Sequence, residues 1–166
     1  MKRPLLFLGA SKGLTLIEML LVIGIVLTLL AIAFLSISNI RVISSNTSTQ
    51  TVLISDLKNQ QIKAMTGDTE GRGTADNYGV KILSDRYVLF HGLSYNPSDS
   101  GNFVIPIDGR QTLTSTFQNG LIIFASNSGE LINFTIGQNT VTIMDDDGES
   151  KVLHFNKYGT ITQVDN

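Results

Sequence analysis

The sequence predicts an α+β fold in which a long N-terminal helix, membrane-spanning in its first half, packs on an antiparallel β-rich head. The first observation is uneven hydropathy, since residues 14–38 hold 19 apolar residues in 25 positions and residues 39–166 hold 45 in 128. The second is an apolar stripe at helical spacing over residues 53–65. The third is a series of short strand-like runs from Tyr78 onward, each bounded by turn residues.

The N-terminal segment has the length and charge pattern of a single membrane span. Lys2, Arg3 and Lys12 are basic, and the 22 residues from Met19 to Ile40 carry no charge. A helix over 14–38 would be about 38 Å long, which exceeds the hydrocarbon core of a bilayer at about 30 Å. The excess of basic residues before the span predicts a cytoplasmic N-terminus and a head outside.

Glu18 is an acidic residue at the start of this apolar run, and the presence of a charge there requires an explanation. A secretory signal peptide is disfavoured because the run is too long and no A-x-A-like cleavage site follows it. A plain anchor, with Glu18 at the membrane edge, remains open. A cut after Gly13 would instead create an α-amine on Leu14, four residues from Glu18. The carboxylate of one chain could then neutralise the amine of the next within an apolar bundle.

The stretch Lys12-Gly13-Leu14-Thr15-Leu16-Ile17-Glu18 resembles the signature of type IV prepilins and type II secretion pseudopilins. That pattern is a basic leader ending in Gly, a hydrophobic residue, Thr, two apolar residues, Glu and a long apolar helix. The resemblance makes the expected α+β fold pilin-like. It implies cleavage after Gly13, N-methylation of Leu14, and a role for Leu14 and Glu18 in assembly.

The same resemblance implies the partners and the location. The partners are a prepilin peptidase that is also an N-methyltransferase, other pilin or pseudopilin subunits, an inner-membrane assembly platform and membrane lipid. The location is the inner membrane, as a single-pass protein, and later a periplasmic or extracellular filament. Two departures from the family pattern are Leu14, where Phe is most common, and the lack of a proline between Pro4 and Pro97.

The remainder of the chain divides by composition. We expect a leader over 1–13, a transmembrane and assembly helix over 14–38, an amphipathic continuation over 39–67 and a β-rich head over 68–166. The continuation carries the helical stripe, formed by Leu53, Leu57, Gln60 and Ala64 with Ile54 and Met65 alongside, and Gly67 suits its C-terminal cap.

The head is expected to contain nine short strands. They are Tyr78–Leu83, Tyr87–His91, Phe103–Ile107, Thr112–Phe117, Leu121–Ala125, Leu131–Ile136, Thr140–Met144, Lys151–Phe155 and Thr160–Val164. The first two read as a hairpin across Ser84-Asp85. The helix ending in Ala64 and the late strand–Gly159–strand also resemble H-type minor pseudopilins and FimT-like minor pilins.

The sequence of the head offers only weak candidates for a metal-binding or catalytic site. Asp145, Asp147 and Glu149 could hold Ca²⁺, but their spacing does not fit an EF-hand loop. Asp147-Gly148 between two strands is a hairpin turn, which explains the acidic run better than a metal does. His91 and His154 lie in strand-like runs 63 residues apart, and the sequence contains no H-E-x-x-H motif. We therefore expect no catalytic residue, no enzyme activity and no cofactor.

The sequence therefore predicts a structural subunit of a type IV pilus or of a type II secretion pseudopilus. Two alternatives remain: a DNA-binding minor pilin used in DNA uptake, and an unprocessed membrane-anchored binding domain. The first alternative is disfavoured because residues 14–166 hold 9 basic and 14 acidic side chains, a net charge of −5. No cluster of five basic residues is present, so we expect no nucleic-acid partner.

Overall fold

The computed structural model describes residues 15–132 and 134–165, with the side chains of residues 33–47 outside the description. The chain divides into two units, Met1–Arg41 and Val42–Asn166. The helix α1 (Leu16–Thr66) contributes residues to both units.

In the second unit, the last turns of α1 supply one wall of the hydrophobic core. The predicted stripe is confirmed for Leu53, Leu57, Gln60 and Ala64, which are all at most 3% exposed, but Met65, expected alongside it, is 52% exposed. The helix ends as Gly67 enters the left-handed region with φ of 64°. The backbone N–H of Asp68 donates to the carbonyl of Lys63 at 3.0 Å, so the predicted glycine cap is also confirmed.

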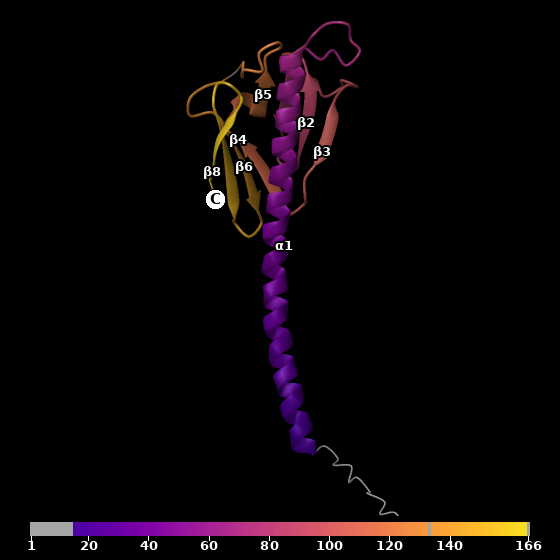
Figure 1. Ribbon diagram of the computed structural model, residues 1–166, viewed down its shortest axis with the longest axis vertical. Coiled ribbons are helices and arrows are strands. Elements are labelled where there is room, and N and C mark those ends of the chain that lie inside the picture. The colour runs from indigo at the N-terminus through magenta and orange to yellow at the C-terminus, as the bar shows by residue number, and fades with distance from the viewer. Residues whose placement is uncertain (1–14, 133, 166) are drawn as a thin grey trace, which may run out of the picture. The chain divides into compact units, whose positions relative to one another are not determined.

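Two four-stranded antiparallel sheets form the rest of this unit (Figure 1). The first has the order β3-β2-β1-β5 and the second has the order β4-β6-β7-β8. A 3-10 turn, η1 (Gln118–Gly120), precedes β5. The strands are β1 (Tyr78–Ile82), β2 (Arg86–His91), β3 (Phe103–Pro106), β4 (Gln111–Ser115), β5 (Leu121–Phe124), β6 (Thr140–Asp145), β7 (Ser150–Phe155) and β8 (Ile161–Asp165).

One core joins the helix to both sheets. Its buried side chains include Leu57 from α1, Val80 and Ile122 from the first sheet, and Ile143 and Leu153 from the second. All five are at most 2% exposed. Because each sheet turns an apolar face toward this shared interior, neither sheet has a complete core without the other and the helix.

Some of the strands predicted from the sequence agree with the structure and others do not. The hairpin across Ser84-Asp85 is confirmed, with Ile82 opposite Tyr87 in the β1–β2 register. The predicted strand Leu131–Ile136 is wrong, since the described residues of that segment form only one isolated bridge, between Phe124 and Leu131. Its apolar residues do not share a face: Leu131 is 4% exposed and Ile136 is 88% exposed.

The predicted fold class, a pilin-like long helix with a membrane-spanning first half packed on the head, is wrong in that form. The helical residues that join the core, Leu53, Leu57 and Ala64, belong to the second unit, and the described side chains of residues 16–32 in the first unit are exposed. The strands of the head form two separate sheets. The sequence pattern of a short strand does not determine which sheet it joins, because pairing between twisted strands depends on long-range contacts.

Within the residues that the structure describes, no helix combines the length and apolarity needed to cross a lipid bilayer.

Candidate functional site

Two residues of the predicted processing and assembly motif, Thr15 and Glu18, lie at the start of α1. Thr15 directly precedes the helix, and its Oγ1 accepts a hydrogen bond from the backbone N–H of Glu18 at 3.3 Å. Thr15 is therefore an N-cap, and the Thr-x-x-Glu spacing is that of a capping box. Glu18 is exposed in the first turn, where the helix dipole favours a negative charge.

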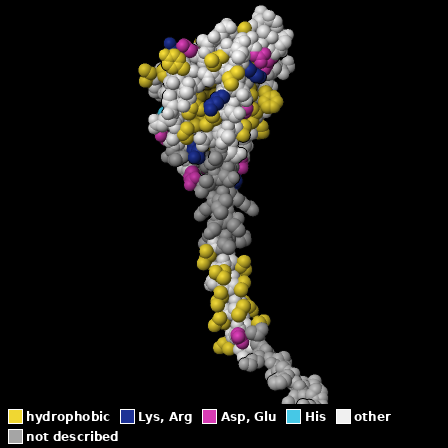
Figure 2. All heavy atoms as spheres, viewed as in Figure 1, with side chains coloured by type: hydrophobic (Ala, Val, Ile, Leu, Met, Phe, Trp, Pro, Cys, Tyr) yellow, Lys and Arg dark blue, Asp and Glu magenta, His cyan; other side chains and the backbone are white. Residues whose placement is uncertain are grey.

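Apolar side chains surround the helix beyond Glu18. Every large hydrophobic residue in 16–32 is exposed, from 47% at Val22 to 83% at Leu16. The run Met19–Ile23 covers more than one full turn, so no face of this segment is polar. Figure 2 shows these hydrophobic side chains on the described part of the first unit.

The one hydroxyl within this apolar segment is satisfied inside the helix. The Oγ1 of Thr28 donates to the carbonyl of Ile25 at 2.8 Å. Such back-bonding lets a threonine lie in an apolar surrounding without an outside partner. At Gly24 an added Cβ would meet no heavy atom within 4 Å, so the glycine is not required there by crowding.

The remaining processing and assembly residues, Gly13 and Leu14, lie outside the described residues. The pairing of the Leu14 amine with Glu18 therefore stays a prediction. Sequence reasoning missed Thr15 as a cap, although the spacing of Thr15 and Glu18 was available to find it.

The acidic run between β6 and β7 forms a turn. The N–H of Gly148 donates to the carbonyl of Asp145 at 2.9 Å, and Gly148 has a φ of 84°. Asp145 is buried, whereas Asp147 and Glu149 are exposed. Across the described residues no three acidic, histidine or cysteine side chains converge in a way that could hold a metal ion.

The two histidines each contact carboxylates on the head. His91 lies between Asp76, at 3.0 Å from its Nδ1, and Asp99, at 3.4 Å from its Nε2. The Nε2 of His154 lies 3.0 Å from Asp165. Both rings are half-buried, and these contacts join loops and strands to one another.

A charged cluster closes the loop that follows α1. The Nζ of Lys63 lies 2.5 Å from Oε1 of Glu70, and Nη1 of Arg72 lies 2.8 Å from Oε2 of the same carboxylate. The hydrogen bond from Lys63 holds the pKa of Glu70 below its usual value, against a smaller opposing effect of burial. Nη2 of Arg72 also donates to the Tyr78 hydroxyl at 2.9 Å.

A second buried tyrosine fixes the helix to the first sheet. The hydroxyl of Tyr87 donates to Oδ2 of Asp56 at 2.6 Å. Burial, and then the contact with Asp56, raises the pKa of the Tyr87 phenol far above its usual value. The neutral phenol is therefore the donor in this hydrogen bond.

No protein-family model, curated protein or solved structure matches this chain.

Proposed function

We propose that this protein is a structural subunit of a type IV pilus or type II secretion pseudopilus. In this proposal the chain is inserted in the inner membrane with its N-terminus in the cytoplasm, cleaved after Gly13 and methylated on Leu14. It then enters a filament through its apolar helix. Its partners are the prepilin peptidase, the assembly platform, membrane lipid and other subunits.

The observation that carries the proposal is the exposed, largely apolar surface of residues 16–32. A helix that is hydrophobic on every face is stable only when lipid or other helices cover it. Exposed fractions of 47–83% on its large side chains leave this surface open to such a covering. Lipid before assembly and neighbouring copies after assembly would cover the same surface in turn.

Glu18 makes the two ends of this apolar segment different from each other. The carboxylate lies in the first turn of α1, at one end of the apolar segment. An unpaired charge there is costly once neighbouring helices exclude water, and an opposite charge offsets that cost. The amine created on Leu14 by cleavage would supply the opposite charge only in processed subunits, so unprocessed chains would be rejected from the filament.

The proposal predicts a processed N-terminus. The full chain would be expressed in cells with and without an active prepilin peptidase, and its intact mass and N-terminal sequence measured. We expect a chain that begins at methylated Leu14 only where the peptidase is active. Gly13→Leu should block cleavage, and Gly24→Leu is the matched control that should not, because it keeps the segment apolar and meets no heavy atom within 4 Å of its Cβ. An intact Met1 in peptidase-positive cells would overturn the proposal.

The role of Glu18 is predicted separately by Glu18→Ala. The variant should be processed normally but largely lost from filaments sheared from the cells, because the Leu14 amine no longer has a partner. Thr15→Ala is the control: it removes the cap hydrogen bond, worth about 1 kcal/mol, but keeps the carboxylate. Equal loss in both variants would assign the effect to helix capping and would count against charge pairing.

A further inference from the structure

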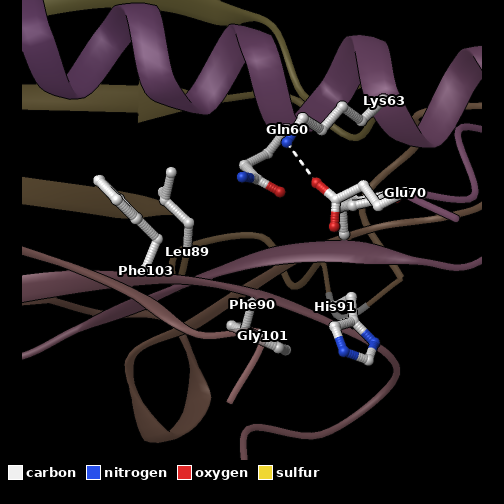
Figure 3. Close-up of a pocket in the computed structure, with 9 residues that line it drawn as sticks. Gln60, Lys63, Glu70, Leu89, Phe90, His91, Gly101 and Phe103 are labelled. Atoms are coloured by element: carbon white, nitrogen blue, oxygen red, sulfur yellow. Dashed lines mark hydrogen bonds and ion pairs between the residues drawn. The ribbon is translucent and has the colours of Figure 1, made fainter. Parts of the chain in front are cut away.

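A cavity of about 330 Å³ lies beneath the last turns of α1 in the second unit. Gln60 and Lys63 line it from the helix, Leu89 and Phe103 from strands β2 and β3, and Glu70 from the loop after the helix. Figure 3 shows the Gln60 amide directed from the helix into the space toward Leu89 and Phe103. The volume of the cavity is at the lower end of the range for small-molecule sites, roughly 300–1,000 Å³.

The amide of Gln60 is the unusual group in this cavity. Gln60 is only 3% exposed, and its Oε1 has no hydrogen-bond partner. A buried acceptor without a partner destabilises a protein unless water or a ligand supplies a donor. The other buried glutamine, Gln111, differs in this respect, since its Oε1 accepts a hydrogen bond from Thr49 at 2.6 Å.

The charges around the cavity disfavour an anionic ligand. Lys63 and Arg72 are both committed to Glu70, at 2.5 and 2.8 Å. Two more carboxylates, Asp76 and Asp99, lie within 3.4 Å of the His91 ring that forms part of the wall. The charged residues of the lining, Lys63 and Glu70, are thus paired with each other. Asp76 and Asp99 add negative charge next to His91. The acceptor on Gln60 also requires a donor rather than an acceptor.

The opposite wall is apolar and aromatic. Leu89 is half-buried, and Phe103, its partner in the β2–β3 register, is 66% exposed at the edge of the sheet. Tyr78 from β1 also lines the cavity, with the centroid of its ring 5.7 Å from the Nζ of Lys63. The apolar part of a small ligand could therefore lie against the sheet while the polar end of the same ligand reaches Gln60.

We propose that this cavity binds a small ligand that carries an amide or amine N–H donor on an aromatic or aliphatic frame. The N–H donates to Oε1 of Gln60, and the frame packs on Leu89 and Phe103. The inference is independent of the filament proposal, because it uses only residues of the second unit.

The test uses the full-length protein in detergent micelles and three probes of similar shape: benzamide, benzoate and toluene. Saturation-transfer NMR and calorimetry would measure their binding. Benzamide should bind, and benzoate should bind at least tenfold more weakly because it lacks the donor and is anionic. Gln60→Leu should weaken benzamide binding about tenfold, the loss of one hydrogen bond, while leaving toluene binding unchanged.

The matched control is Gln118→Leu, since Gln118 is exposed in η1 and does not line the cavity. It should bind all three probes as the wild type does. If Gln60→Leu does not fold, Phe103→Ala is the second variant, and it should weaken benzamide and toluene alike. No binding of benzamide up to its solubility limit, equal binding by Gln60→Leu, or preference for benzoate would overturn the proposal.

Discussion

At the scale of single residues, Glu70 joins the end of α1 to the loop that follows it. Its carboxylate accepts from both Lys63 and Arg72, and its pKa is lowered chiefly by the hydrogen bond from Lys63. A carboxylate with a depressed folded-state pKa stabilises the protein above its unfolded pKa. This contribution is lost as the pH falls through the folded pKa.

Glu70→Gln is therefore predicted to destabilise the head by about 0.2–1 kcal/mol at neutral pH, the range for an exposed ion pair. The difference between wild type and variant should shrink as the pH falls below the usual carboxyl pKa of 4.5. Near-ultraviolet circular dichroism can follow unfolding, because all four tyrosines lie in the second unit. Glu149→Gln, at an exposed turn position, is the control, and an equal pH dependence there would contradict the prediction.

Some residue-level features follow from the sequence and others do not. The burial of Gln60 could be predicted because it lies on the same helical stripe as Leu57 and Ala64. That its Oε1 lacks a partner could not, since this depends on which strand packs opposite. The capping box of Thr15 and Glu18 is local, so the sequence contained all that was needed to find it.

At the scale of elements, Gly159 allows the turn between β7 and β8 to approach the helix. Its φ is 73°, and an added Cβ would lie 2.8 Å from Cε1 of Phe124 and 2.7 Å from Nε2 of Gln61. The same Nε2 donates to the carbonyls of Gly129 and Tyr158 at 3.1 and 2.7 Å. A side chain at position 159 would thus disturb the contact between the turn and α1.

Gly159→Ala is predicted to destabilise the head by about 1–3 kcal/mol more than Gly148→Ala, because overpacking adds to backbone strain. Gly148 is the matched control: its φ is 84°, and nothing lies within 4 Å of its added Cβ. Its own substitution should cost only the left-handed strain, about 1–2 kcal/mol. Thermal unfolding of both variants would test this prediction. Equal destabilisation by the two substitutions would show that the turn does not need close contact with α1.

Element positions are largely predictable here, but their pairing is not. The 3.6-residue period predicted the helical stripe, and turn residues predicted the hairpin across Ser84-Asp85. Strands β3 and β4 flank Asp108-Gly109 in the sequence yet lie in different sheets. The period-2 pattern of a strand is the same whichever sheet it joins, so long-range packing decides.

At the scale of the whole molecule, the head defined from composition, 68–166, omits part of its own core. Leu53, Leu57 and Ala64 precede that boundary, and they pack with side chains from both sheets. All three are at most 2% exposed. Removal of these helical residues would leave the inner faces of two four-stranded sheets in water, at a cost of roughly 2–5 kcal/mol for each large side chain lost.

A fragment of residues 42–166 should therefore unfold in urea as one cooperative transition, as expected for a single core of this size. A fragment of residues 68–166 should show no cooperative transition and no near-ultraviolet circular dichroism from Tyr78 and Tyr87, whose rings are 1% exposed against that core. The triple variant Leu53→Ala, Leu57→Ala, Ala64→Ser in the longer fragment separates lost packing from lost chain length, and it should behave like the shorter fragment. If residues 68–166 instead unfold as cooperatively as residues 42–166, the two sheets hold their own core, and the helix is only attached to it.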